Sequence, residues 1–153
     1  MRNLSQHPLQ RAFLLGFVML ALSTLAHAQQ GLARTLGNAD RAKIQRVISS
    51  QIKAFEREDD LIAFSYAAPA VRRYFGSPQA FMEMVKTGYE SLYRNRSAEF
   101  LEASVIDGNV IQPLRIVTFD GDVVVALFTM EQQSDKEWRV SGCEIAESTV
   151  QAA

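Results

Sequence analysis

The spacing of the apolar residues changes once along the chain, near Asn95, and this change constrains the fold more than any other feature. Before it, apolar residues recur at spacings of three and four, the pattern of amphipathic helices. After it, short β-branched runs alternate with turn residues. Because the helical segments precede the strands instead of alternating with them, the pattern predicts an α+β domain.

Three helices are predicted before this change. The first covers residues 40–58, with Asp40 as its N-cap. A second, shorter helix begins at Asp59-Asp60 and ends before Pro69, and residues 71–75 can add one further turn. The third begins at Ser77-Pro78, a capping hydroxyl followed by proline, and reaches about Tyr93.

Four strands are predicted after it, over residues 98–106, 110–119, 123–131 and 137–146. Asp107-Gly108 and Asp120-Gly121 separate the first three, and Asp-Gly between apolar runs is a strong hairpin signal. We therefore expect a curved four-stranded antiparallel sheet with the helices packed on one face. Pro113 cannot donate a ladder hydrogen bond, so an edge or a bulge is expected there.

Residues 1–28 have the features of a cleavable secretory signal peptide. Arg2 and Arg11 accompany an apolar run over residues 12–22, and Ala26-His27-Ala28 has the small-x-small pattern of a cleavage site. The run is short for a bilayer, which needs about 20 apolar residues, so no stable membrane span is expected after cleavage. We expect a flexible lead-in at residues 29–39, one domain at 40–148 and a tail at 149–153.

Cleavage after Ala28 would change the chemical inventory. It would leave 14 of the 16 basic residues against 17 acidic ones, a net charge of −3, which gives no reason to expect nucleic-acid binding. It would also remove both histidines, His7 and His27, and leave Cys143 as the single cysteine. Cys/His metal sites and histidine-dependent nucleophilic pairs are then excluded, and no metal or other cofactor is predicted.

Several short motifs resemble those of one bacterial family. They are the stretch Ile52-Lys53-Ala54-Phe55, the run Tyr74-Phe75-Gly76-Ser77-Pro78 and the run from Trp138 to Cys143. In these motifs the chain resembles the bacterial domain-of-unknown-function family 4864, within the cone-shaped superfamily of nuclear transport factor 2. This resemblance covers about residues 44–147, and implies a cone-like fold and an envelope location, but no activity.

The resemblance also suggests a catalytic hypothesis. In the ketosteroid isomerases of that superfamily, an aspartate base and a tyrosine hydroxyl move a proton within the cone pocket. The corresponding candidates here are Asp59 or Asp60 with Tyr66 or Tyr89. The competing interpretation is that the aspartates cap a helix and that the tyrosines belong to the core.

Other residues are candidates for ligand binding. Arg72 and Arg73 can offer an anion-binding rim, although such arginines are commonly solvated surface residues. Gln112 lies beside Pro113, and Trp138 can be either a core anchor or a stacking platform. Cys143 is expected to be a buried small hydrophobe; if it is exposed, it is a redox site.

Three functions follow from these observations. We favour an exported protein, periplasmic or secreted, that binds a small ligand or a protein partner without catalysis. The first alternative is a small proton-transfer enzyme that uses the Asp and Tyr candidates in the cone pocket. The second alternative is a structural module that forms a homodimer through its sheet.

Overall fold

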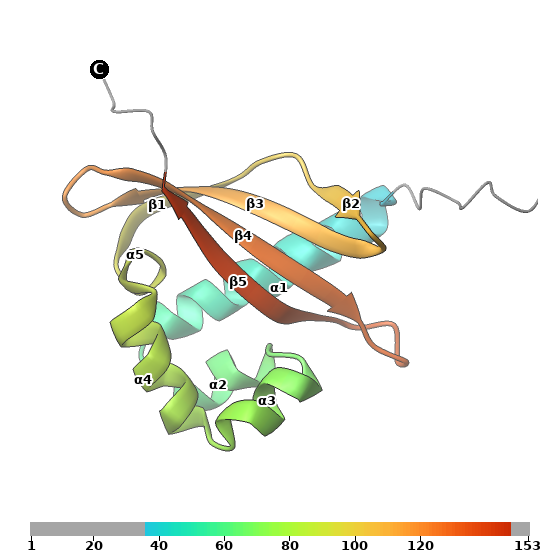
Figure 1. The fold of residues 1–153 in the computed structure, drawn as a ribbon, viewed down its shortest axis with the longest axis horizontal. Coiled ribbons are helices and arrows are strands. Elements are labelled where there is room, and N and C mark those ends of the chain that lie inside the picture. The colour runs from blue at the N-terminus through green and yellow to red at the C-terminus, as the bar shows by residue number, and fades with distance from the viewer. Residues whose placement is uncertain (1–35, 148–153) are drawn as a thin grey trace, which may run out of the picture. The chain divides into compact units, whose positions relative to one another are not determined.

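The computed structural model describes residues 36–147, in which five helices precede five strands (Figure 1). The helices are α1 (Asn38–Glu56), α2 (Asp60–Ser65), α3 (Pro69–Phe75), α4 (Pro78–Gly88) and α5 (Glu90–Tyr93). The strands are β1 (Asn95–Phe100), β2 (Ser104–Ile106), β3 (Asn109–Thr118), β4 (Val123–Gln132) and β5 (Trp138–Glu147). The α+β class is confirmed, but the predicted numbers of three helices and four strands are wrong. The predicted signal peptide and tail lie outside the described residues.

Helix α1 is amphipathic, and its apolar stripe contributes four side chains to the core: Ile44, Ile48, Ile52 and Phe55. The helix begins at Asn38 with Gly37 as its N-cap, so the predicted capping role of Asp40 is wrong. Asp40 lies in the first turn, where a carboxylate interacts favourably with the helix dipole. Its Oδ1 accepts a 3.2 Å hydrogen bond from Nε1 of Trp138, which ties the helix start to β5.

Side-chain caps begin two of the following helices. Asp59 accepts a 3.1 Å hydrogen bond from the backbone N–H of Ile62 at the start of α2. Ser77 accepts one from the N–H of Ala80 at the start of α4, where Pro78 is the first helical residue. Both helix starts are therefore stabilised by a capping side chain that lies three residues before the N–H it accepts from.

The predicted third helix is interrupted at Tyr89. Helix α4 ends at Gly88, Tyr89 has φ −134° and ψ 44°, and the single turn α5 follows. Glycine is a poor helix former, and the Tyr89 hydroxyl hydrogen-bonds to the backbone of β5. The break therefore has a local cause in Gly88 and a tertiary one in the contact of Tyr89.

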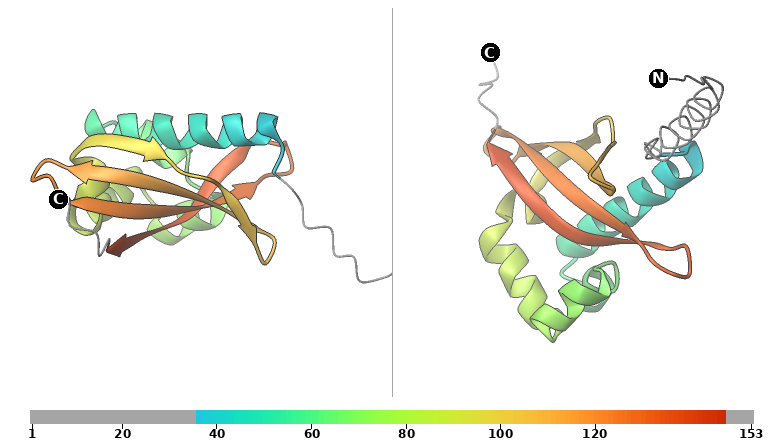
Figure 2. Two further views of the ribbon diagram at one scale, coloured as in Figure 1. Left: turned by 90° about the horizontal axis from the view of Figure 1, so that it is seen from above. Right: turned by 45° about the vertical axis from the view of Figure 1, so that its right-hand side comes forward.

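The sheet is antiparallel in the order β1-β3-β4-β5, and β2 also pairs with β3. Asp107 and Gly108 both have positive φ and join β2 to β3 in a two-residue turn, as the Asp-Gly signal predicts. The second Asp-Gly pair lies in the longer connection between β3 and β4. Figure 2 shows that the sheet is strongly twisted and that the helices lie on one of its faces.

The strand predicted at residues 98–106 is divided into β1 and β2, and the cause lies opposite, at Pro113. Pro113 accepts a 3.0 Å hydrogen bond from the N–H of Leu101 but has no N–H with which to return it. The side chain of Gln112 supplies the missing donor, because its Nε2 lies 2.8 Å from the carbonyl oxygen of Leu101. The expectation of an edge was wrong, because β3 is a central strand and Pro113 pairs in register with Leu127 on β4. On its other side the ladder is irregular, as the alternative of a bulge predicts: residues 101–103 oppose only Gln112 and Pro113.

Strand β5 has one free edge, and the connection between α2 and α3 covers part of it. The N–H of Val140 donates to the carbonyl of Tyr66 at 2.9 Å, and the N–H of Ala68 donates to the carbonyl of Val140 at 2.8 Å. The register of β5 on β4 shifts at Ser141, which forms a bulge just after this contact. These bonds hold the helices beside the sheet edge.

Candidate functional site

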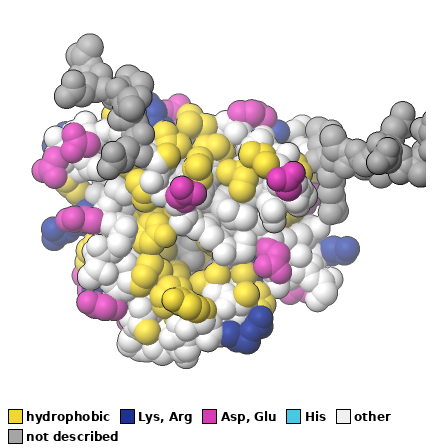
Figure 3. Space-filling view, viewed as in Figure 1, with side chains coloured by type: hydrophobic (Ala, Val, Ile, Leu, Met, Phe, Trp, Pro, Cys, Tyr) yellow, Lys and Arg dark blue, Asp and Glu magenta, His cyan; other side chains and the backbone are white. Residues whose placement is uncertain are grey.

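A cavity of about 430 Å³ lies between β5 and the helices α3 and α4. The inner face of the sheet contributes Phe128 and Val140, and the helices contribute most of the rest. Figure 3 shows hydrophobic side chains in a band on this side of the molecule, from the sheet to the helices below it. The lining residues are Gln51, Phe55, Ala67, Val71, Phe75, Phe81, Met84, Val85, Tyr89, Leu92, Phe128, Val140, Ser141, Gly142 and Cys143.

The lining is apolar and uncharged. Within the part of the chain that the structure describes, no aspartate, glutamate, lysine or arginine lines the cavity. Side-chain polarity comes from Gln51, Tyr89 and Ser141, together with the thiol of Cys143. An apolar cavity with a few polar groups is the usual form of a small-molecule site.

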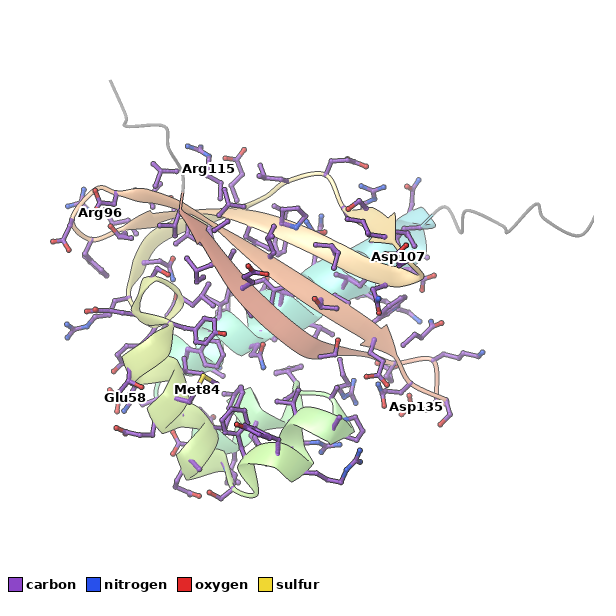
Figure 4. The ribbon with its side chains drawn as sticks, viewed as in Figure 1. Glu58, Met84, Arg96, Asp107, Arg115 and Asp135 are labelled. Carbon is purple, nitrogen blue, oxygen red and sulfur yellow. The ribbon has the colours of Figure 1, made fainter. Side chains whose placement is uncertain are left out.

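The aromatic wall of the cavity is built by packing between helices. The ring centroid of Phe81 lies 6.2 Å from that of Phe55, 5.6 Å from that of Phe64 and 5.5 Å from that of Phe75. Tilted and edge-to-face pairs of this kind hold each ring in place. In Figure 4 Met84 lies on the side of α4 that faces the sheet. Phe55, Phe75 and Phe81 line the cavity together with the adaptable thioether of Met84, whereas Phe64 lies outside the lining and packs against Phe81.

The wall formed by β5 is fixed by two hydroxyl groups. Tyr89 donates a 2.8 Å hydrogen bond to the carbonyl oxygen of Cys143, across a separation of 54 residues. Ser141, in the bulge, donates a 3.1 Å hydrogen bond to the carbonyl oxygen of Thr129. Both hydroxyl protons are therefore already used within the protein, and both oxygens keep the capacity to accept.

The two titratable groups of the lining are held neutral. Cys143 is half-buried. Loss of hydration is the main cause that raises the pKa of its thiol to about 12, and the nearby charge of Glu144 adds to it. Burial also raises the pKa of the Tyr89 hydroxyl. At neutral pH the cavity therefore presents a thiol and a phenol, and neither a thiolate nor a phenolate.

Gln51 is the buried polar residue of the lining, with 1% of its surface exposed. Its Nε2 donates a 3.0 Å hydrogen bond to the carbonyl oxygen of Ala63 in α2. A carbonyl can only accept, so this bond determines which end of the amide faces α2. Sequence reasoning missed Gln51, although a signal existed: it is a polar residue within the apolar stripe of α1, three residues after Ile48.

The candidate catalytic pairs are not brought together in this cavity. Asp59 and Asp60 lie at the α1–α2 junction outside the lining, and Asp59 caps α2. Tyr66 also lies outside the lining, where its carbonyl accepts from Val140. Tyr89 is the one candidate of this group that lines the cavity.

The candidate ligand-binding residues lie elsewhere as well. Arg72 and Arg73 are exposed on α3, outside the lining of the cavity. Gln112 is fully buried in the core, where its Oε1 has no hydrogen-bond partner among the described residues. Trp138 is buried at the opposite end of α1 from the cavity, on Asp40.

No cluster of three or more His, Cys, Asp or Glu side chains in residues 36–147 is placed to hold a metal ion. No helix in that range is both long and apolar enough to cross a membrane.

Comparison with known families gives one match. The family model described as a domain of unknown function, DUF4864, matches residues 37–153. Neither the curated proteins nor the solved structures contain a significant match to the chain. The wider placement in the superfamily of nuclear transport factor 2 therefore stays a prediction.

Proposed function

The chain belongs to the DUF4864 family, and from its cavity we propose that this domain binds a small, uncharged and largely apolar molecule in the bacterial envelope. The observation that carries the proposal is the lining: about 430 Å³ bounded mainly by apolar and aromatic side chains, with no charged side chain among the described residues that line it. The volume lies within the usual range of small-molecule sites. Envelope location rests on the predicted signal peptide.

The cavity favours binding over the two alternatives. Proton transfer next to a carbonyl needs a base, and the candidate carboxylates Asp59 and Asp60 lie outside the lining. The neutral state of Cys143 and Tyr89 leaves neither group as an anionic base or nucleophile at neutral pH. A dimerising sheet would not require an apolar cavity on the helical face.

A neutral fluorescent probe tests this proposal. N-phenyl-1-naphthylamine becomes bright in apolar surroundings, and we expect a saturable increase with one site per chain. Val71 lines the cavity on α3, so Val71→Phe should fill part of it and weaken binding about tenfold or more. Ala70→Phe places the same ring at an exposed position of the same helix and should leave binding unchanged.

Three results would contradict the proposal. The first is the absence of saturable binding by the native protein, and the second is equal binding by both phenylalanine variants. The third is probe fluorescence that persists after unfolding in urea, because binding would then not need the folded cavity.

A further inference from the structure

The polar groups of the cavity point to one kind of ligand. Gln51 is 1% exposed and lines the cavity, and its Nε2 is bound to the carbonyl of Ala63. Among the hydrogen bonds of the described residues, none ends on its Oε1. Oε1 of Gln51 therefore keeps its capacity to accept, so a ligand that enters the cavity can donate a hydrogen bond to it.

The other polar atoms of the cavity have the same character. The hydroxyl protons of Tyr89 and Ser141 are already donated to the carbonyls of Cys143 and Thr129. Their oxygens, like Oε1 of Gln51, can accept a further hydrogen bond. The cavity therefore presents three oxygen acceptors, while most of the strong side-chain donors in its wall are already engaged.

Charge restricts the ligand further. A carboxylate or ammonium group inside the cavity would lose its hydration with no opposite charge in the described lining to compensate. A neutral hydroxyl or amide loses much less hydration free energy and regains a hydrogen bond in the cavity. Apart from Gln51, Tyr89, Ser141 and the thiol of Cys143, the lining side chains are apolar, so most of the remaining molecule should be hydrocarbon.

We propose that the ligand is a neutral amphipathic molecule of the alcohol type, whose O–H enters first and donates to Oε1 of Gln51. Its apolar body then fills the space toward the half-buried side chains of Val71, Phe75 and Met84. This inference rests on the proposed binding function and adds which chemical group the cavity selects.

Two isomers separate the roles of the hydroxyl and the hydrocarbon. 1-Octanol and heptyl methyl ether have the same atoms, but only the alcohol can donate a hydrogen bond. In displacement of N-phenyl-1-naphthylamine from the native protein, we expect the alcohol to bind about fivefold more tightly, the effect of one hydrogen bond. Octanoate should compete less well than the alcohol, because its charge is not compensated.

A variant of Gln51 tests whether its amide oxygen causes the preference for the alcohol over the ether. Gln51→Met keeps the length of the side chain and removes the acceptor, so the preference for the alcohol should fall towards one while the probe still binds. Gln45→Met makes the same change on α1 outside the cavity lining and should keep the fivefold preference. The comparison of the two isomers on the native protein requires no variant to fold.

The outcomes distinguish the two proposals. If the probe binds but the native protein does not prefer the alcohol, the role of Gln51 is overturned and the binding function stands. A preference that survives in Gln51→Met would also overturn that role. If the probe does not bind at all, the binding function is overturned, and the inference that rests on it falls with it.

Discussion

The hydroxyl of Tyr89 lies 2.8 Å from the carbonyl oxygen of Cys143 and joins the break between α4 and α5 to the edge of β5. Both residues belong to the lining of the cavity, so this hydrogen bond lies in its wall. It also accounts for a helix that ends earlier than its apolar spacing predicts. The same contact therefore connects the fold to the candidate site.

Tyr89→Phe should lower the free energy of unfolding by about 1 kcal/mol, the typical contribution of one hydrogen bond. Urea unfolding at neutral pH measures the change. Tyr74→Phe is the matched control, because Tyr74 is 83% exposed and should tolerate the loss of its hydroxyl. Equal effects of the two substitutions would show that the bond to Cys143 contributes nothing to stability.

The Cys143 thiol should make stability depend on pH in the alkaline range. Its pKa is raised to about 12 in the folded protein, whereas an unfolded cysteine ionises near pH 8.5. Stability contributed by the protonated thiol is complete below the unfolded pKa and is lost as pH rises towards the folded one, by up to about 1.4 kcal/mol per pH unit.

Urea unfolding of the native protein and of Cys143→Ala between pH 8 and pH 10.5 measures this dependence. The native protein should lose more stability over that range than the variant. The same raised pKa predicts that a thiol reagent reacts at least about a hundredfold more slowly with folded than with unfolded protein at pH 8. Parallel pH curves, or rapid labelling of the folded protein, would contradict the burial of the thiol.

The side-chain amide of Gln112 should contribute to stability because the neighbouring Pro113 has no backbone N–H. Gln112→Leu removes the donor to the carbonyl of Leu101 and should cost about 1–3 kcal/mol in the free energy of unfolding. In a Pro113→Ala background the backbone N–H can serve that carbonyl, so the same substitution should cost less. A double-mutant cycle measured by urea unfolding compares the cost of Gln112→Leu in the two backgrounds. Equal costs would show that the backbone N–H of residue 113 does not replace the side-chain donor of Gln112.

The predicted signal peptide can be tested by expression in a bacterium. Export followed by cleavage after Ala28 should yield a chain that starts at Gln29, which intact-mass measurement detects. Ala28→Phe should block cleavage, because the peptidase requires a small residue there, whereas Ala33→Phe should be processed normally. A full-length mass for the native chain in the envelope fraction would contradict the prediction.

The elements that could be predicted from the sequence are those with local causes. The stripe of α1, the Asp59 and Ser77 caps and the Asp107-Gly108 turn depend on residues within a few positions of one another. Two of the elements predicted wrongly also depend on residues that are distant in the sequence. The division between β1 and β2 depends on Pro113, and the break after α4 involves the bond from Tyr89 to Cys143.

The residues of the candidate site also depend on contacts between distant segments. The residue types suggested an aspartate with a tyrosine, but packing places Tyr89 in the cavity and leaves Asp59 and Asp60 outside it. Gln51 lines the cavity, and its Nε2 bonds to the carbonyl of Ala63 in α2, which packs against α1. Such a partner could not be predicted from the spacing of residues along one helix.

The sequence by itself determined the order of helices and strands, the hairpin turn at Asp107-Gly108 and the change of apolar spacing near Asn95. These features follow from backbone preferences and from which face of each element is apolar, and both are local properties. The tertiary structure decided which polar groups share the cavity and which of them keep a free acceptor. That result depends on hydrogen bonds and burial between distant segments, such as Tyr89 with Cys143, which arise only when the sheet and the helices pack.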